Sequence, residues 1–473
     1  MCCGYADVLP VSATRASAFL QHDATYRITL TAGPGSIHSR PVRQQLHQLH
    51  RRSEPLRVSE GPLTTPNSER KPTLVSLFSG AGGLDLGLER AGFHTVSATD
   101  MDANCMKTLQ KVQESNVPVR GHEGRFHLEG ARLLHVPAAE LKAADLRPEG
   151  ATSRWRPDVL AGGPPCQPFS SAGRQRGIED PRGKLFLEFV SLAEQLKPRL
   201  ILFENVRGLV TAKDPNGEPG GVLRLIRSSF EEIGYATRFK LLNAADFGAA
   251  QRRIRLFMIA SKDRILPDFP EPTHGRLVGD TLIGDVKPWV TLGEFLSGQP
   301  TPKPEDVVYP SGSLVEELKG LSPGTGVKSG GIVEANRPSG HWGYRQDRFL
   351  ADLDMPARTI RAATTPDWVR LEDGTLRRIT WRECAALQGF PREWEFQGTV
   401  ASRFRQIGNA VQADVAEKMG LMLMQSISSN KKAAPKSAPW PPEFHKWMAY
   451  TAMEHQTNGE HRAAARKQRE MAG

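Results

Sequence analysis

From Thr73 onward, short apolar runs alternate with segments of helical periodicity, and this alternation limits the possible folds more than any other feature of the chain. The predicted strands are Thr73–Phe78, Thr95–Thr99, Asp158–Ala161, Leu200–Glu204 and Ile254–Ala260, and the predicted helices are Leu84–Ala91, Leu185–Gln195 and Gly221–Ile233. Strands and helices in this order are typical of an α/β protein with a parallel, doubly wound sheet, which binds ligands beyond the carboxyl ends of its strands.

The pattern divides the chain into two domains between two tails. The parts are a weakly ordered or disordered extension (1–71), the strand-and-helix domain (72–261), a smaller domain rich in proline and glycine (262–345), a part that returns to the first domain (346–426) and a basic tail (427–473). Helical patterns at Thr380–Gln388 and Ala413–Gln425 mark the returning part. We therefore expect a second domain to be inserted before the chain returns to the first.

The net charge of +10 lies mostly outside the predicted domains. Each tail carries a net charge of +4, and residues 262–345 hold nine basic and eleven acidic side chains. Overall charge therefore predicts solvated tails rather than a general phosphate-binding surface, and any contact with DNA must come from local sites.

Cysteine use and hydropathy predict a reducing, cytoplasmic location. Nothing in the sequence is long and apolar enough to span a membrane, and the N-terminus lacks the basic and apolar regions of a secretory signal. We expect no metal, because no Cys/His cluster has ligand spacing. The five cysteines, too scattered for a disulfide framework, are Cys2, Cys3, Cys105, Cys166 and Cys384.

The sequence GGPPCQPFS places Cys166 directly after a predicted buried strand. Pro164 and Pro165 fix φ and donate no backbone hydrogen bond, so the thiol is expected in a rigid, extended turn. A lone intracellular cysteine is most often a small buried hydrophobe. A thiol at the carboxyl end of a strand nevertheless lies where α/β enzymes keep their reactive groups, which favours a nucleophile.

The glycine-rich sequence SGAGGLDLG follows the first predicted strand, and Asp100 follows the second. Glycines allow the backbone to approach a ligand closely, and a carboxylate at this place in doubly wound folds binds ribose hydroxyls. The loop lacks the lysine of a phosphate-binding P-loop, which favours a nucleoside ligand without phosphates. A plain strand-to-helix turn with a capping aspartate is the alternative.

Charged side chains stand at the ends of two further strands. Glu204 ends a buried strand, and two interpretations of its carboxyl are open. It is either partly desolvated, and then able to donate a proton to a substrate ring nitrogen, or it is a solvated cap of the strand. Arg253 and Arg255 alternate onto one face of the next strand. They either hold a carbonyl oxygen and phosphates or form an ordinary exposed basic face.

These blocks, in this order, resemble the cytosine carbon-5 DNA methyltransferases over about Thr73–Met422. The matching blocks are SLFSGAGGLDLG, Asp100, GGPPCQPFS, DPRGKLF, ENV, QRRIR, PARTI and QIGNAV. The resemblance implies a Rossmann-like methyltransferase sheet that binds S-adenosylmethionine, a target-recognition domain between QRRIR and PARTI, and a return that packs GNAV beside the glycine loop. The implied cofactor contacts are Phe78, Gly80, Gly82, Leu84, Asp100, Met101, Asp145, Pro165, Leu185, Asn409 and Val411.

The resemblance also implies a role for each polar residue of the site. Cys166 would add to carbon-6 of a flipped-out cytosine, and Glu204 would protonate or hydrogen-bond ring nitrogen-3. Arg255, supported by Arg253, would hold the base carbonyl and a nearby phosphate. One departure is that Gln412 follows GNAV where many members continue with proline.

The implied partner is double-stranded DNA, bound by a monomer. The implied DNA contacts are Ser170, Arg174, Arg176 and Gln251. Arg174 and Arg176 belong to a loop that either closes over DNA or is simply mobile. Bases would be read by a few side chains of the smaller domain, such as Lys328, Asn336 or Arg337.

Three functions fit these features. The first is a DNA cytosine-5 methyltransferase, either the modification half of a restriction system with its endonuclease or a solitary enzyme. The second is a tRNA methyltransferase of the same family, which the long segment between QRRIR and PARTI disfavours. The third is a cofactor-fold protein that only binds nucleic acid, and an intact set of Cys166, Glu204 and Arg255 argues against it.

Overall fold

A computed structural model gives the structure of the chain. It describes residues 71–165, 185–214, 216–263, 265–278, 281–282, 285–326, 348–429, 434–446 and 448. All of them belong to the compact unit Glu69–Gly473. The predicted extension before Lys71 therefore lies outside the described residues.

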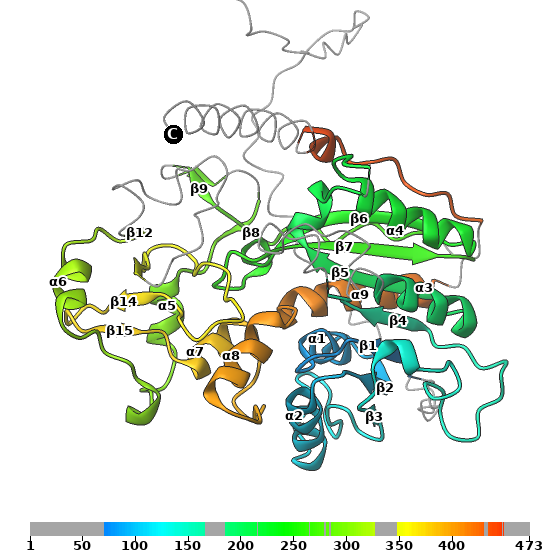
Figure 1. Cartoon of the computed structure of the whole chain (residues 1–473), viewed down its shortest axis with the longest axis horizontal. Helices are drawn as coiled ribbons and strands as arrows, with labels where there is room; N and C mark the ends of the chain where they lie inside the picture. Colours follow the sequence, from blue (N-terminus) through cyan, green and yellow to red (C-terminus); the bar gives the residue numbers. More distant parts are fainter. Residues whose placement is uncertain are drawn as a thin grey trace, which may run out of the picture. The chain divides into compact units, whose positions relative to one another are not determined.

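A seven-stranded sheet forms the centre of this unit, in the order β3-β2-β1-β4-β5-β7-β6 (Figure 1). Its strands are β1 (Thr73–Leu77), β2 (His94–Thr99), β3 (Arg132–Leu134), β4 (Val159–Gly162), β5 (Leu200–Val206), β6 (Ala236–Asn243) and β7 (Ile254–Ser261). The predicted doubly wound α/β fold is confirmed, because the strand order reverses between β1 and β4.

The sheet is mixed rather than parallel, which corrects the prediction. Strand β7 lies between β5 and β6 and runs antiparallel to both. One short 3-10 turn, Ala244–Phe247, is the only helical element between β6 and β7. A crossover to a parallel strand needs a longer connection, so β7 folds back beside β6.

Helices cover both faces of the sheet because its strands alternate apolar side chains to both sides. Val75, Leu77 and Phe203 pack with α3 (Leu185–Leu196) and α4 (Gly221–Glu232). The opposite face presents side chains such as Leu74 to α1 (Gly83–Arg90) and α9 (Ala413–Ser428). Helix α9 comes from the far end of the sequence and packs beside α1 on this face.

A smaller four-stranded sheet has the order β12-β13-β14-β15. Strand β12 (Thr325–Gly326) comes from the predicted smaller domain, whereas β13 (Phe349–Leu350), β14 (Trp368–Arg370) and β15 (Leu376–Arg378) lie beyond the predicted boundary at residue 345. This small sheet thus takes strands from both sides of that boundary. The other elements between β7 and α9 are β8 (His274–Gly275), β9 (Leu277–Val278), β10 (Thr281–Leu282), β11 (Lys287–Pro288), α5 (Leu292–Ser297), α6 (Ser313–Lys319), α7 (Trp381–Leu387) and α8 (Val400–Asn409).

Part of the predicted basic tail packs on the edge of the large sheet. The Ala438 N–H donates to the Thr237 carbonyl at 2.8 Å, and the Phe444 ring stacks on Phe239 of β6 at 5.1 Å. An edge strand has unpaired backbone groups, and these contacts cover some of them on β6. No helix within the described ranges is long and apolar enough to cross a membrane.

Candidate active site

The carboxyl ends of β4 and β5 bring the GGPP turn against Glu204. The two strands pair in parallel, with Gly162 opposite Phe203. A Cβ atom at Gly163 would lie 2.7 Å from Glu204 Oε2, so a side chain at this position would displace the carboxyl of Glu204. The Asn205 side-chain amide donates to the Pro164 carbonyl at 3.0 Å. The turn that leads to Cys166 is therefore fixed on the Glu-Asn-Val strand end.

Glu204 is buried, with 8% of its surface exposed, which excludes the solvated-cap alternative. Its Oε1 lies 3.3 Å from Arg255 Nε, which comes from the neighbouring strand β7. Burial raises the pKa of Glu204, while the charges of Arg255 and Arg253 act in the opposite direction. The carboxyl is thus held near a cation but in an environment that favours its protonated form.

Arg253 lies just before β7 and is also buried, so the exposed-basic-face alternative is excluded. Its Nη1 donates to the Ile360 carbonyl at 3.0 Å, and Nη2 donates to the carbonyls of Gly408 and Ala410 at 2.9 and 2.6 Å. One guanidinium therefore joins the QRRIR, PARTI and GNAV blocks. Its contacts indicate a structural role, and Arg255 is the arginine that faces Glu204.

Gln251, predicted to contact DNA, has its side-chain polar atoms bonded inside the protein. Its side chain is fully buried, and its Nε2 donates to the Leu387 carbonyl at 3.2 Å and to Gln388 Oε1 at 3.1 Å. Its Oε1 accepts the Ile360 N–H at 2.9 Å. Gln251 thus belongs to the same buried polar cluster as Arg253.

Arg253→Met is expected to lower the free energy of unfolding by about 3–5 kcal/mol, because three buried carbonyls lose a charged donor. Equilibrium chemical denaturation measures this loss. Arg224→Met is the matched control: Arg224 Nη2 also donates to a backbone carbonyl, that of Pro219, but on the exposed surface of α4. The control is expected to change stability by less than about 0.5 kcal/mol. Equal losses in both variants would contradict the structural role of Arg253.

The glycine loop lies beside the ends of β1 and β2. The Ser79 N–H donates to the Thr99 carbonyl, and the Gly80 N–H donates to Asp100 Oδ2, both at 2.9 Å. Gly80 has a φ of +57°, and no atom lies within 4 Å of the position that a Cβ would take. The loop therefore leaves open space where a ligand can approach its backbone.

Asp100 and Met101 lie next to this loop. The Asp102 N–H donates to Asp100 Oδ1 at 2.8 Å, so each carboxylate oxygen of Asp100 is oriented by a backbone amide. Burial raises the pKa of Asp100. Met101 is 66% exposed, which is unusual for a large apolar side chain. A carboxylate with free lone pairs beside an open apolar side chain suits a ribose and an adenine ring.

The returning segment GNAV packs against the start of α1. A Cβ atom at Gly83 would lie 2.4 Å from the Val411 carbonyl oxygen, so the expected placement of GNAV beside the glycine loop is confirmed. Asn409 is exposed at the end of α8. The departure at Gln412 has a structural explanation, because Gln412 Oε1 caps α9 by accepting the Val415 N–H at 2.9 Å.

The remaining predicted cofactor residues differ in their surroundings. Leu84 is buried in α1 and packs in the core, whereas Pro165 is exposed at the GGPP turn. Phe78 has a φ of +55°, a strained conformation for a non-glycine residue at the end of β1. Asp145 accepts the Lys142 N–H at 3.0 Å, and Leu185 begins α3.

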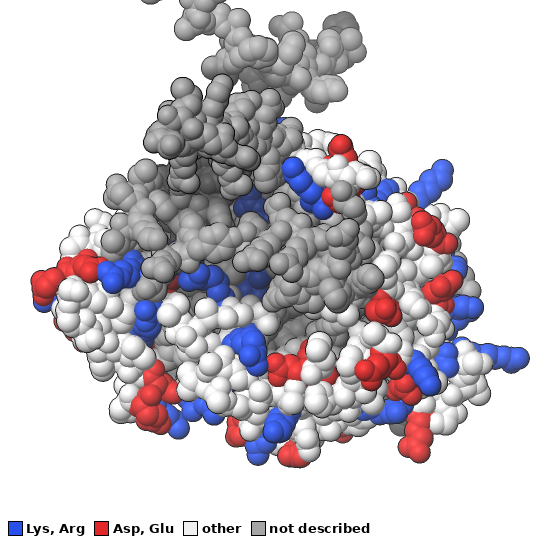
Figure 2. Space-filling model, in the orientation of Figure 1, with Lys and Arg blue, Asp and Glu red and all other residues white. Residues whose placement is uncertain are grey.

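Several predicted residues lie outside the described part of the chain. They are Cys166, Ser170, Arg174, Arg176, Lys328, Asn336 and Arg337. On the described surface, Figure 2 shows basic and acidic side chains interspersed, in line with the small net charge of the domains. Among the described residues, no group of His, Cys, Asp or Glu side chains is arranged to hold a metal ion.

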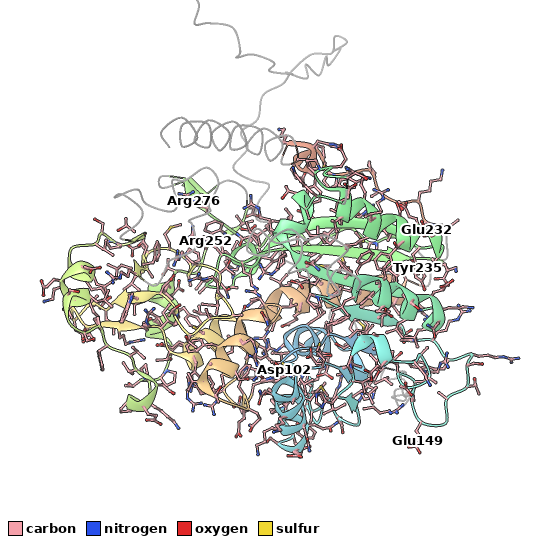
Figure 3. The ribbon with its side chains drawn as sticks, in the orientation of Figure 1. Asp102, Glu149, Glu232, Tyr235, Arg252 and Arg276 are labelled. Atoms are coloured by element: carbon pink, nitrogen blue, oxygen red, sulfur yellow. The ribbon has the colours of Figure 1, made fainter. Side chains whose placement is uncertain are left out.

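Sequence reasoning missed the contacts that join distant segments. Asp102, labelled in Figure 3, caps α2 (Ala103–Glu114) by accepting the Asn104 N–H at 2.8 Å, and Arg405 of α8 donates to its other oxygen at 3.0 Å. The buried Gln388 donates to the Ile407 carbonyl at 2.6 Å. An aspartate before an amphipathic helix is a recognisable cap, but no local signal identifies its partner on α8.

A doubly wound sheet with a nucleoside-type loop at one strand end and a buried carboxyl at a neighbouring one defines a Rossmann-like enzyme. The family model described as C-5 cytosine-specific DNA methylase matches residues 73–425. The chain belongs to this family, whose members use S-adenosylmethionine as the methyl donor.

Individual relatives agree with this assignment. The chain is 30% identical over 384 residues to the type II methyltransferase M.FnuDI of Fusobacterium nucleatum, covering 76% of this chain and 96% of that protein. It is 31% identical over 385 residues to M.Eco47II of Escherichia coli, covering 79% and 84%. A solved structure from an E. coli prophage, a candidate DNA modification methyltransferase, has the same fold, with a TM-score of 0.51, 24% identity, and coverage of 76% and 99%.

Proposed function

We propose that this chain methylates carbon-5 of a flipped-out cytosine in one short sequence of double-stranded DNA, as the modification enzyme of a restriction-modification system. The observation that carries the proposal is the buried Glu204, which lies against Arg255 on one side and against the turn leading to Cys166 on the other. A protonated carboxyl and a thiol are the two groups that cytosine activation needs.

Carbon-5 of cytosine is a poor nucleophile, so the ring is first activated by addition. The Cys166 thiolate forms a bond to carbon-6, and the electron pair moves through the ring while Glu204 donates a proton to nitrogen-3. Carbon-5 is then nucleophilic and takes the methyl group of the sulfonium co-substrate, whose sulfur keeps the electron pair of the broken bond and leaves as a thioether. Loss of the carbon-5 proton to a base returns an electron pair to the ring, and the sulfur–carbon-6 bond breaks to release Cys166. Nitrogen-3 returns its proton to Glu204, which restores the neutral base and the acid. Arg255 holds the base carbonyl and stabilises the developing charge.

The residues of the glycine loop fit the cofactor. Gly80 leaves an open cradle, Asp100 has lone pairs free for ribose hydroxyls, and Met101 offers an apolar surface to the adenine ring. S-adenosylmethionine supplies an electrophilic methyl group when it is bound there.

A tRNA substrate remains the second candidate, since the chemistry would be the same. The type II relatives and the long segment between QRRIR and PARTI favour DNA.

Single-base mapping of 5-methylcytosine tests the proposal. The full chain is expressed in a host without cytosine methylation, and marks confined to one short motif are expected in its genomic DNA. Unmarked DNA from soluble, well-expressed protein would contradict a DNA substrate, and tRNA from the same cells is then mapped. The Cys166→Ala chain, expressed to the same level, is the background control.

A further inference from the structure

Trp394 lies against the glycine loop. It belongs to the segment between α7 and α8, more than 300 residues after the loop in the sequence, and it is 2% exposed. Its indole Nε1 donates to the Ala81 carbonyl at 2.9 Å. A Cβ atom at Gly82 would lie 2.9 Å from the indole ring. The loop is therefore held by a hydrogen bond to the end of β2 and by a second one from the indole of Trp394.

The indole ring is itself fixed by its neighbours. The His127 ring meets it edge-on at 5.4 Å, and the Phe390 ring lies 5.5 Å away. His127 Nδ1 lies 2.6 Å from a carboxylate oxygen of Glu89. Glu89 belongs to α1, the helix that follows the glycine loop. Trp394 is thus connected to the loop by its N–H and to the following helix through His127.

We propose that Trp394 is a positioning residue for the cofactor, holding residues 79–82 in the conformation that receives the adenosine part of S-adenosylmethionine. This inference rests on the assignment of the loop as the cofactor site. Gly80 and Gly82 both have positive φ, at +57° and +83°. Glycines lose more conformational freedom on ordering than other residues do. A loop that was not held in place would lose this entropy when the cofactor binds, which would weaken binding.

The location of Trp394 predicts which kinetic constants change. Its contacts are with the loop and not with Glu204 or Arg255, so it affects cofactor affinity more than chemistry. Ala81 is only 1% exposed. A variant without the indole N–H leaves its buried carbonyl without this hydrogen-bond donor. Pre-organisation of a binding loop raises affinity by removing part of the ordering cost.

Trp394→Phe in the full-length protein tests the inference. We expect the Kd for S-adenosylhomocysteine, measured by isothermal titration calorimetry, and the KM for S-adenosylmethionine to rise about tenfold. The kcat and the Kd for DNA are expected to stay within about twofold. Benzothienylalanine at position 394 keeps the bicyclic ring without the N–H and isolates the hydrogen bond if the phenylalanine variant folds poorly.

Trp381→Phe is the matched control. Trp381 is also buried, and its Nε1 donates at 2.7 Å to Asp306, away from the loop. Equal affinities of the Trp381→Phe and Trp394→Phe variants, or a loss of kcat without a change in KM, would overturn the positioning role. Asp100→Asn reports on the site itself: if it leaves cofactor affinity unchanged, the loop assignment fails, whereas a loss in Asp100→Asn alone overturns only the role of Trp394.

Discussion

Cys166→Ala is expected to abolish methyl transfer, lowering kcat by about four to six orders of magnitude, because no other group can form the bond to carbon-6. Binding of S-adenosylhomocysteine is expected to remain within about threefold of the wild type. Transfer of a labelled methyl group to DNA, measured beside calorimetric titration of S-adenosylhomocysteine, separates the two effects.

The two cysteines that the structure describes are expected to be poor nucleophiles. Cys105 and Cys384 are buried free thiols, and burial raises the pKa of both. Cys384→Ala, which removes a thiol from α7, is the matched control and is expected to keep turnover within about threefold. Turnover in the Cys166→Ala variant would contradict the nucleophile assignment, whatever the control does.

The sequence predicted the parts of the structure that depend on local pattern. Apolar runs marked β1, β2, β4, β5 and β7 to within two residues at each end, and the residues that follow them carry the site. The positions of the glycine loop and Glu204 follow from this, because parallel strands end at one edge of a sheet. Strand β6 was missed, since Ala236–Asn243 alternates basic and apolar residues and has no glycine boundary on its carboxyl side.

The roles of Gln251 and Arg253 could not be predicted from their own neighbourhood. Both belong to a basic, polar pentapeptide whose pattern is typical of a surface strand. Both are buried because the chain returns more than 100 residues later to supply carbonyls to Arg253 and a backbone N–H to Gln251. Gly408 shows the same dependence: a Cβ there would lie 2.2 Å from the backbone of Arg361 and Ala362. Contacts of this kind are set by the tertiary structure, and only the family resemblance indicated that these blocks meet.

The second large effect is expected at Glu204. Glu204→Gln is expected to lower kcat by about 10²–10³-fold, because an amide can donate a hydrogen bond to ring nitrogen-3 but cannot give up a proton. Glu232→Gln, on the exposed surface at the end of α4, is the matched control and is expected to leave kcat unchanged (Figure 3). Steady-state rates with saturating DNA and cofactor measure both variants.

The pH dependence gives a sharper test of the same residue. Burial favours the neutral carboxyl and raises the pKa of Glu204, so its proton is retained as pH rises past the ordinary glutamate range and is lost only above the raised value. The kcat of the wild type is therefore expected to fall on the alkaline side of that pKa, while ionisation of Cys166 raises the rate from the acid side. Glu204→Gln has no proton to lose and should lack the falling limb. A falling limb that persists unchanged in this variant would assign it to another group and contradict Glu204 as the acid.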